Sequence, residues 1–557
     1  MRKLALLFLL PVTMAEAQIP LPSYPSWSSF DNDYSTGGVL VDVTGDGRID
    51  LFVSNGNDMA MNRNAIYVSR GDSLEQIASW RSADAGYFGH CYAGDVDNDG
   101  DIDLAVAYLG PSGDLRVRVY ANNGHGLDST PIWKARDQHS SFDCCFGDVD
   151  LDGDLDLAIS AGDAYSGQVD SARIYRNSNG IIDTLPFWTA RDGTASDAVR
   201  FCDIDLDGDL ELFVGHRRRL TMYQNNAGVL DPTPAWVVER NVGWVLRLAF
   251  GDYDGDTYPD LAVAYNDQLG DPNGICVFRN NRGTLDTVPA FTMWASSDYT
   301  SCVEWGDVDG DGDLDLAAGG WWQPVAVFHN DRGTLGTMPA WSWQDGQNLV
   351  CEAVIFGDVR NNHIISAAGV FDGDGRRGLF TLAHRPIQFL DSVVVDGNRM
   401  PFAGYCSDFA AGWLSFVQPP PAGVGNVIVY YRYSRYPDLA VTNWVRTAGS
   451  HLFFNSTPTG IRGGLQDDVC FSVTPNPFST HVFFQRNQDV DDHHGLLGFD
   501  NALLRIYDGI GRLVFCAPLK EFPVVWDGLD LQGRSVLPGV YFVRLLKTSV
   551  KLVRSNH

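Results

Sequence analysis

A nine-residue loop rich in aspartate carries the clearest chemistry in this chain. Its fullest copy runs Asp307-Val-Asp-Gly-Asp-Gly-Asp-Leu-Asp315, with carboxylates at the first, third, fifth and ninth positions and Gly312 at the sixth. Alternate side chains converge while the glycine permits a sharp bend, and hard cations prefer carboxylate oxygens. The loop therefore predicts an oxygen cage for calcium.

Five more copies of this loop precede it. The expected ligands of loops one to six are, in order, Asp42, Thr44, Asp46 and Asp50; Asp95, Asp97, Asp99 and Asp103; Asp148, Asp150, Asp152 and Asp156; Asp203, Asp205, Asp207 and Glu211; Asp252, Asp254, Asp256 and Asp260; and Asp307, Asp309, Asp311 and Asp315. The alternative is an aspartate-rich turn that needs no ion. Because clustered carboxylates repel one another without a cation, we expect about six structural calcium sites.

Two units depart from the pattern. Loop five has Thr257 where glycine is expected, and a positive φ is costly for a β-branched residue, so we expect its backbone to bend differently. A seventh unit begins at Asp358 but carries Arg360 and Asn362 in ligand positions. It is expected to bind no ion.

The loops recur with a regular period. Their first aspartates stand at 42, 95, 148, 203, 252, 307 and 358, with spacings of 53, 53, 55, 49, 55 and 51 residues. In a typical unit the loop is followed by a short apolar strand such as Leu104-Ala-Val106, an alternating strand that ends at Tyr120, and the closing motif Pro131-Ile-Trp133. Four short strands in a unit of this length predict one β-propeller blade.

An aromatic-glycine step precedes several loops, as at Phe250-Gly251. Together with the aspartate loop and the Leu-Ala-Val strand, this step resembles the FG-GAP repeat of integrin α-chain propellers and of bacterial VCBS-type secreted proteins, over roughly residues 25–385. The resemblance implies calcium in each loop and a seven-bladed ring. The expected fold is all-β: a calcium-binding propeller of seven blades, or alternatively eight, with an inserted β-module and a C-terminal Ig-like sandwich.

The period fails after His384. Residues 386–435 contain alternating β-rich runs separated by proline and glycine, which predicts an inserted β-module. Within 436–460, Pro437-Asp-Leu-Ala-Val441 and Leu452-Phe-Phe-Asn455 match two blade strands without their loop, so this segment is expected to close the propeller of residues 18–385.

Both ends of the chain predict export. Arg2 and Lys3, an apolar run and Ala15-Glu-Ala17 indicate a signal peptide over residues 1–17. Residues 470–557 contain strand and turn motifs such as Gly539-Val-Tyr-Phe-Val-Arg544 that are typical of an Ig-like sandwich. This segment resembles the C-terminal sorting domain of type IX secretion substrates. The resemblance implies contact with secretion machinery and a secreted or cell-surface protein.

Composition narrows the choice of partners. The formal net charge is -30, which repels phosphate backbones and disfavours nucleic acid. No apolar run after the leader is long enough to span a membrane. Most of the ten cysteines directly precede a loop and are expected to pack as small apolar residues rather than to form bridges.

Three further motifs each have two interpretations. Trp321-Trp322 offers rings for sugar stacking, although strand alternation sends one ring into the core. Arg217-Arg-Arg219 is interpreted as a solvated hairpin in preference to an anion site, and Asp491-Asp-His-His494 as a polar loop in preference to a zinc site.

No nucleophile elbow, zinc-protease motif or phosphate loop is present, and no catalytic residue is assigned, so enzyme activity is left open. The leading hypothesis is a secreted or surface-displayed adhesion protein that binds an extracellular protein or glycan through hairpins on one face. The alternative is a carbohydrate-active enzyme, similar to a polysaccharide lyase, with its site at the propeller's centre. Convergence of Arg, Lys, His or Tyr around one pocket would favour the enzyme, whereas a hairpin-built face would favour binding.

Overall fold

The computed structural model describes residues 19–456 except 111–113, 125, 163–169, 267–272, 296–298 and 345–348, and then mainly the strands of a second unit. The chain divides into Met1–Pro458 and Thr459–His557. The regular secondary structure of the described residues consists of strands joined by loops and turns, with one short 3-10 helix at Phe402–Gly404. None of their helices has the length and apolar character needed to cross a bilayer. The signal peptide expected at 1–17 lies outside the described residues.

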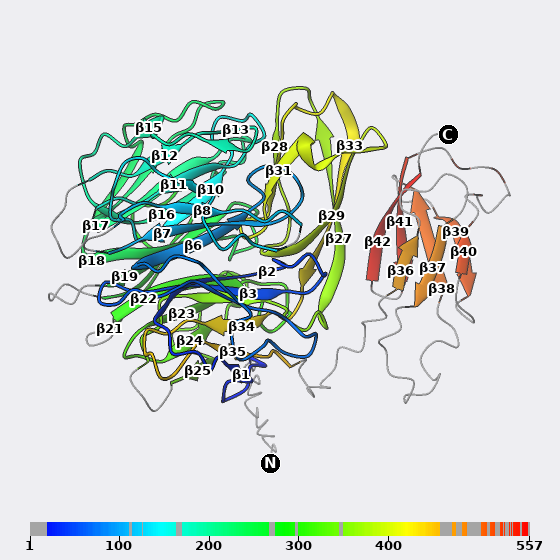
Figure 1. Ribbon diagram of the computed structural model, residues 1–557. Coiled ribbons are helices and arrows are strands. Elements are labelled where there is room, and N and C mark those ends of the chain that lie inside the picture. Colours follow the sequence, from blue (N-terminus) through cyan, green and yellow to red (C-terminus); the bar gives the residue numbers. More distant parts are fainter. Residues whose placement is uncertain are drawn as a thin grey trace, which may run out of the picture. The chain divides into compact units, whose positions relative to one another are not determined.

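The repeats fold as antiparallel sheets whose strands follow chain order (Figure 1). Four of these sheets are β2 (Ser35–Val41), β3 (Asp50–Asn55), β4 (Ala65–Tyr67) and β5 (Trp80–Arg81); β6 (Phe88–Gly94), β7 (Asp103–Tyr108), β8 (Arg118–Tyr120) and β9 (Trp133–Lys134); β10 (Cys144–Gly147), β11 (Asp156–Ile159), β12 (Arg173–Tyr175) and β15 (Trp188–Thr189); and β22 (Tyr299–Gly306), β23 (Asp315–Trp321), β24 (Val325–Phe328) and β25 (Trp341–Trp343). A small hairpin, β13 (Asn177–Ser178) with β14 (Ile181–Ile182), follows β12. In these four sheets the aspartate loop joins the first two strands.

Units four and five share one six-stranded sheet. Its strands are β16 (Ser196–Cys202), β17 (Glu211–Tyr223), β18 (Trp236–Gly251), β19 (Asp260–Asn266), β20 (Asn273–Phe278) and β21 (Phe291–Ala295). The long strand β18 pairs with β17 near its start, where Trp236 lies opposite Met222, and with β19 along its end, where Gly251 lies opposite Asp260. One strand therefore serves as the last strand of unit four and the first strand of unit five.

The last sheet of the repeat region joins the two ends of that region. Its order is β1 (Trp27–Ser28), β35 (His451–Phe453), β34 (Asp438–Val441) and β26 (Val354–Gly357). Trp27 lies opposite Leu452, so residues near the start of the chain complete a sheet that begins more than 300 residues later. Both strands expected in the closing segment 436–460 belong to this sheet.

One hydrogen bond recurs between successive units. A side chain just after the third strand donates to a backbone carbonyl in the aspartate loop of the preceding unit. The bonds are Asn122 to Val43 at 2.7 Å, Asn177 to Val96 at 2.7 Å, Asn225 to Val149 at 2.8 Å, Asn280 to Ile204 at 2.7 Å, Asn330 to Tyr253 at 2.6 Å and Asn455 to Val308 at 2.7 Å. The Ser69 hydroxyl of unit one donates to the Val359 carbonyl of unit seven at 3.2 Å. Unit one therefore follows unit seven in the same way as the other units follow one another.

The cores lie within and between the sheets. Small and branched side chains from adjoining strands, such as Ala105, Val119 and Leu157, are fully buried. The cysteines described in this region are buried free thiols, so they pack as apolar side chains.

An inserted module interrupts unit seven. One of its sheets contains β27 (Ile364–Gly373), β33 (Gly423–Ser434), β29 (Ile387–Val395) and β30 (Asn398–Arg399), and the other contains β28 (Leu379–Thr381), β32 (Trp413–Phe416) and β31 (Tyr405–Asp408). The expected bounds of this module were 386–435, but β27 pairs along most of β33 and extends the module back to residue 364. The start of the module was missed because the small apolar residues of β27 resemble those of the second strand of a blade.

The second unit contains two antiparallel sheets among its described strands. They are β36 (Phe471–Thr474), β37 (Val482–Arg486) and β40 (Val524–Trp526), and β39 (Leu513–Pro518), β38 (Leu503–Asp508), β41 (Gly539–Leu545) and β42 (Thr548–Arg554). The segment Asp491–His494 lies outside the described residues.

Candidate functional site

Loop two shows how the sequence builds these acidic turns. The first carboxylate, Asp95, accepts hydrogen bonds from the backbone N–H groups of Asp99 at 3.0 Å and Gly100 at 2.9 Å. The ninth, Asp103, accepts from Val96 at 2.8 Å and Asn122 at 2.7 Å. These backbone donors fix two carboxylates at opposite sides of the turn, so the loop is shaped by its own aspartates.

The expected ligands converge in loops two to six. Ligand atoms within 4.8 Å of one another belong to Asp95, Asp97 and Asp99; Asp148, Asp150 and Asp156; Asp203, Asp205 and Glu211; Asp252, Asp254 and Asp260; and Asp309, Asp315 and His329. In loop one, Asp42 accepts from Asp46 and Gly47, as Asp95 does from the corresponding residues. The fifth-position carboxylates Asp152, Asp207, Asp256 and Asp311 accept N–H groups two residues further along.

The donor set fits a hard divalent cation. Burial, together with repulsion from neighbouring carboxylates, raises the pKa of Asp95 and of Asp307 to about 7. Among the described residues, both buried carboxylate oxygens of Asp203 lack a hydrogen-bond partner, and the nearest cationic atom is Arg377 Nη2 at 3.8 Å. The clusters of loops two to five offer oxygen ligands alone and match the coordination preference of calcium, whereas the cluster of loop six also includes His329.

Loop five corrects one expectation. Thr257 has φ +82°, within the range of the glycines at the same position in the other loops, where φ lies between +81° and +100°. The expectation of a different bend was therefore wrong. The Thr257 N–H donates to Asp252 at 2.8 Å, the same bond that holds the glycine elsewhere, so the strained backbone is kept by the loop's own hydrogen bonding.

Unit seven contains a carboxylate that sequence reasoning missed. Asp438 lies opposite Gly357, just as Asp103 lies opposite Gly94, and it accepts N–H groups from Val359 and Asn455 in the same way. It is therefore the ninth residue of loop seven, separated from the first by the inserted module. The Asp-Leu-Ala-Val run at 438–441, identical to 103–106, was the available signal.

Three basic residues near the loops were also missed. Arg176 lies 2.9 Å from Asp150, Arg279 contacts Asp254, and His329 lies 3.3 Å from Asp309. Each residue stands directly before the asparagine that links successive units, and each faces the third-position carboxylate. A hydrogen bond to Asp315 raises the pKa of His329 to about 9.

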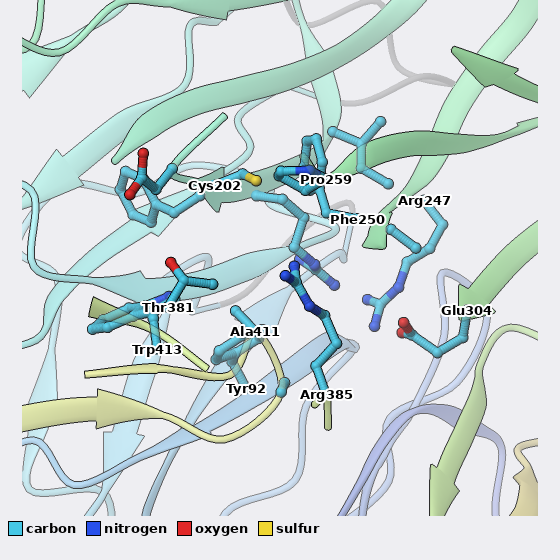
Figure 2. A pocket seen from close by; sticks show the side chains of 16 residues that line it. Tyr92, Cys202, Arg247, Phe250, Pro259, Glu304, Thr381, Arg385, Ala411 and Trp413 are labelled. Carbon is cyan, nitrogen blue, oxygen red and sulfur yellow. The ribbon is translucent and has the colours of Figure 1, made fainter. Parts of the chain in front are cut away.

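A second cluster lies where the inner strands meet the inserted module. Two adjoining cavities of about 80 and 110 Å³ share Tyr92, Arg247, Glu304 and Arg385 in their walls. Figure 2 shows the guanidinium groups of Arg247 and Arg385 directed into the cavity, with the Glu304 carboxylate beside Arg247. Burial raises the pKa of Glu304, although Arg247 and Arg200 act in the opposite direction.

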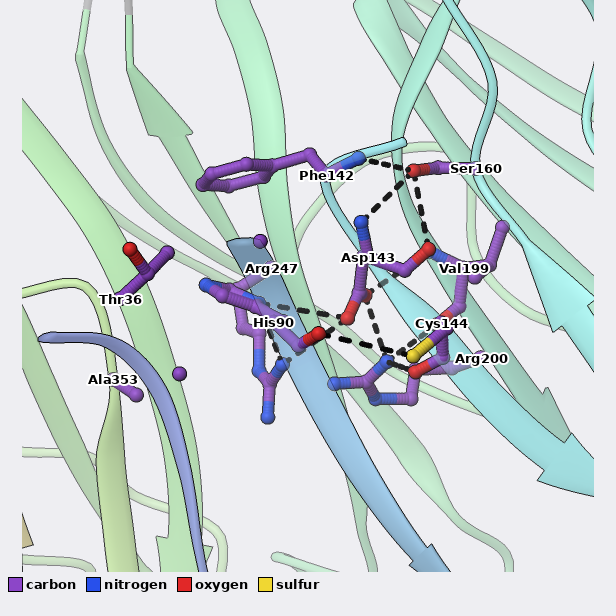
Figure 3. Close-up of polar contacts among 12 residues, drawn as sticks. Thr36, His90, Phe142, Asp143, Cys144, Ser160, Val199, Arg200, Arg247 and Ala353 are labelled. Carbon is purple, nitrogen blue, oxygen red and sulfur yellow. Dashed lines mark hydrogen bonds and ion pairs between the residues drawn. The ribbon is translucent and has the colours of Figure 1, made fainter. Parts of the chain in front are cut away.

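A buried aspartate holds two of the arginines in place (Figure 3). Asp143 accepts from Arg200 Nη1 at 2.7 Å, and its other oxygen lies 3.4 Å from Arg247 Nη1. His90 accepts from Arg247 at 2.9 Å and lies 3.5 Å from Asp143. The two guanidiniums hold the pKa of Asp143 well below its usual range despite complete burial. The cluster is therefore a fixed, charged arrangement.

The module also anchors itself to the repeats and encloses a larger cleft. The Tyr92 hydroxyl donates to Asp408 of the module at 2.8 Å. A cleft of about 970 Å³ lies between the module and the loops of units five and six. Its module wall includes Arg385 and the stacked rings of His384 and Tyr433, whose centroids are 3.7 Å apart.

Of the two adjacent tryptophans, one is buried and the other is exposed, as strand alternation predicts. Trp321 is 4% exposed and stacks on Trp444 with a centroid distance of 5.7 Å, whereas Trp322 is 48% exposed. Arg217 and Arg218 are exposed on β17.

The comparisons with known proteins agree with the repeats. A family model described as an FG-GAP-like repeat matches residues 42–106, 95–159, 203–263 and 258–318. The chain contains FG-GAP-like repeats. All six expected calcium loops fall within the matched residues, and the repeats fold as a β-propeller-like arrangement of sheets.

No curated protein matches the chain. Among solved structures, one match comes from a study of the specific recognition of non-reducing terminal N-acetylglucosamine by an Agrocybe aegerita lectin. It shares 20% sequence identity, covers 54% of this chain and 79% of the other, and superimposes with a TM-score of 0.34. We take no inference about ligands from this match.

Proposed function

We propose that this protein is a secreted, calcium-stabilised β-propeller that binds an extracellular glycan or protein beside its inserted module. Seven blades are supported by the recurring bond between units, which returns to its start where Ser69 donates to Val359. Export is supported by the leader expected at 1–17 and by the likeness of 470–557 to sorting domains. Extracellular calcium would fill the acidic loops.

The cleft of about 970 Å³ is the observation that carries this proposal. Its volume matches that of known ligand sites, and it is built from loops and hairpins on one side of the propeller. Tyr433 and the His384 ring offer an aromatic surface, while Arg385 and Arg377 offer donors to oxygen-rich ligands. Flat rings and guanidinium groups together are typical of saccharide recognition, so a glycan is the preferred ligand.

The convergent arginines at the centre are the feature that would favour an enzyme. The two cavities that they line, about 80 and 110 Å³, are smaller than typical substrate pockets. Tyr92 is also a poor candidate for a base, because burial raises its pKa well above the ordinary value and its hydroxyl donates to Asp408. Binding therefore remains the proposed function.

A glycan array probed with calcium and with chelator tests the proposal directly. We expect calcium-dependent binding that is weakened in Tyr433→Ala and unchanged in Tyr24→Ala, a control at an 80% exposed ring. Any glycan that binds is then incubated with the protein. Release of shortened saccharides would replace the binding proposal with the enzymatic one.

Calcium is tested separately by thermal unfolding. Chelation should lower Tm, and added calcium should restore it, because ions that bind only the folded state stabilise it by mass action. An unchanged Tm on chelation would show that the loops hold no structural calcium.

A further inference from the structure

We propose that the central cavity beneath the inserted module binds a small oxyanion, held by Arg200, Arg247 and Arg385. This site borders loop four, whose Asp203 also lines the cavity, and it goes beyond the glycan or protein binding proposed above. The three arginines come from β16, β18 and the module segment before β29, and all three line the cavity of about 80 Å³. Their convergence therefore depends on the module being folded over the inner strands.

The arginines at this cavity are unequally paired with carboxylates. Both oxygens of Asp143 are engaged, one by Arg200 and the other by Arg247. Glu304 is the carboxylate beside Arg247 (Figure 2), so among the described residues the carboxylates that contact these arginines lie at Arg200 and Arg247 and not at Arg385.

Two other carboxylates nearby are committed elsewhere. Asp203 belongs to the calcium cluster of loop four, and Asp408 accepts hydrogen bonds from Tyr92 and from the Ala411 N–H. In the described part of the chain, neither one forms a hydrogen bond or ion pair with Arg200, Arg247 or Arg385. A bound anion would give these guanidinium groups an acceptor.

Unused donors point to the same guest. Arg200 is 8% exposed, and its Nη2 has no hydrogen-bond partner among the described residues. A buried donor left unpaired is costly, and a guanidinium nitrogen is especially so. Within the described part of the chain, Arg385 forms no ion pair although it reaches the same cavity. Both groups are positioned to donate to one acceptor.

The size of the cavity limits the ligand to a few heavy atoms. Adjoining volumes of about 80 and 110 Å³ admit a carboxylate or a sulfate but not a sugar ring with its substituents. Arginine binds planar or tetrahedral oxyanions through paired N–H groups. Since Arg385 also lines the larger cleft, the oxyanion is either a free ion or the acidic group of a larger molecule seated in that cleft.

Binding of small anions to the calcium-loaded full chain tests this site. Sulfate, acetate and glucuronate are titrated against chloride at constant ionic strength and followed by calorimetry. We expect saturable binding that Arg385→Gln weakens about ten-fold or more, since a charge-assisted hydrogen bond is lost. Arg376→Gln is the matched control, because Arg376 is exposed on the same module and is not among the residues that line the cavity.

The results separate the possible sources of the anion. Tighter binding of sulfate supports a free inorganic ion, and tighter binding of glucuronate than of acetate supports an acidic saccharide. Arg385→Lys, which keeps the charge but loses the paired donors, should fall between wild type and Arg385→Gln. Absence of binding to wild type, or equal binding by Arg385→Gln and Arg376→Gln, would overturn the site. A negative glycan array leaves these titrations unaffected, so the two proposals fail separately.

Discussion

The Arg360 guanidinium lies 3.5 Å from the Asp438 carboxylate, at the third position of a loop whose ninth position is Asp438. It also donates to the Asn455 carbonyl at 2.7 Å and lies over the Phe454 ring. In units two to six the corresponding place in the loop is surrounded by carboxylates, which are ligands that calcium prefers. In unit seven the guanidinium of Arg360 takes the place of a bound cation. This explains why the unit has the first and ninth aspartates although the other ligands are absent.

Replacing Arg360 with aspartate should create an additional calcium site. Asp358, the new carboxylate and Asp438 would then occupy the first, third and ninth positions, as Asp148, Asp150 and Asp156 do in unit three. Bound calcium, measured by elemental analysis after dialysis, should rise by one ion per chain relative to wild type. Arg360→Asn, which removes the cation without adding a carboxylate, is the control. An identical calcium content in Arg360→Asp and Arg360→Asn would contradict the assignment.

Thr257→Gly should raise the free energy of unfolding by about 0.5–1 kcal/mol, since it relieves a β-branched residue at φ +82° while adding some chain entropy to the unfolded state. The reverse change, Gly312→Thr, should cost about 1–2 kcal/mol. No atom lies within 4 Å of a Cβ added at Gly312, so only backbone strain is introduced there. Urea unfolding at saturating calcium measures both changes. The two substitutions should change the free energy of unfolding in opposite directions. Changes of the same sign and size would show that Thr257 is not strained.

Asp143→Asn should lower the free energy of unfolding by about 3–5 kcal/mol, because it leaves Arg200 and Arg247 buried without their shared counter-charge. Asp114→Asn provides the control, since Asp114 pairs with Arg116 and Lys134 at a partly exposed site. That change should cost about 1 kcal/mol or less. Equilibrium unfolding in denaturant compares the two. If both variants lose the same amount, the central cluster is not the tightly coupled group described above.

His90 predicts a specific dependence of stability on pH. Burial, with Arg247 and Arg200 acting in the same direction, lowers its pKa to about 4, although Asp143 opposes them. The ordinary value is 6.5. The unfolded chain therefore takes up a proton between these values while the folded chain does not. The contribution of His90 is complete above pH 6.5 and is lost as pH falls towards 4.

The variant His90→Gln should abolish this dependence. Its stability difference from wild type should change by about 1 kcal/mol between pH 7 and pH 5.5, with wild type losing more. Thermal unfolding at several pH values and saturating calcium provides the measurement. Parallel curves for the two proteins would show that His90 does not titrate in this way.

Local spacing made the loops predictable, but long-range placement hid other groups. The expected ligands of each of the six loops lie within nine consecutive residues, so these carboxylates could be assigned from sequence. Asp438 was missed because the module separates it from Asp358. Asp143 and Arg247 each stand five residues before a loop, and Arg200 stands three before, at positions that strand geometry turns towards the same centre. A charged residue three or five residues before a loop was therefore a signal in the sequence. It could be interpreted only once the ring of sheets showed that these positions face one another.

The pairing of Gly357 with Asp438 also has a practical consequence for how such proteins diversify. The chain leaves the propeller and returns to it at two residues that already face each other across a strand pair. A short loop like that of unit two would span the same gap, because Gly94 and Asp103 are paired in the same way. The module can therefore be replaced without changing the strands that hold it. Exchange of residues 358–437 for another module is the simplest way to change the binding specificity.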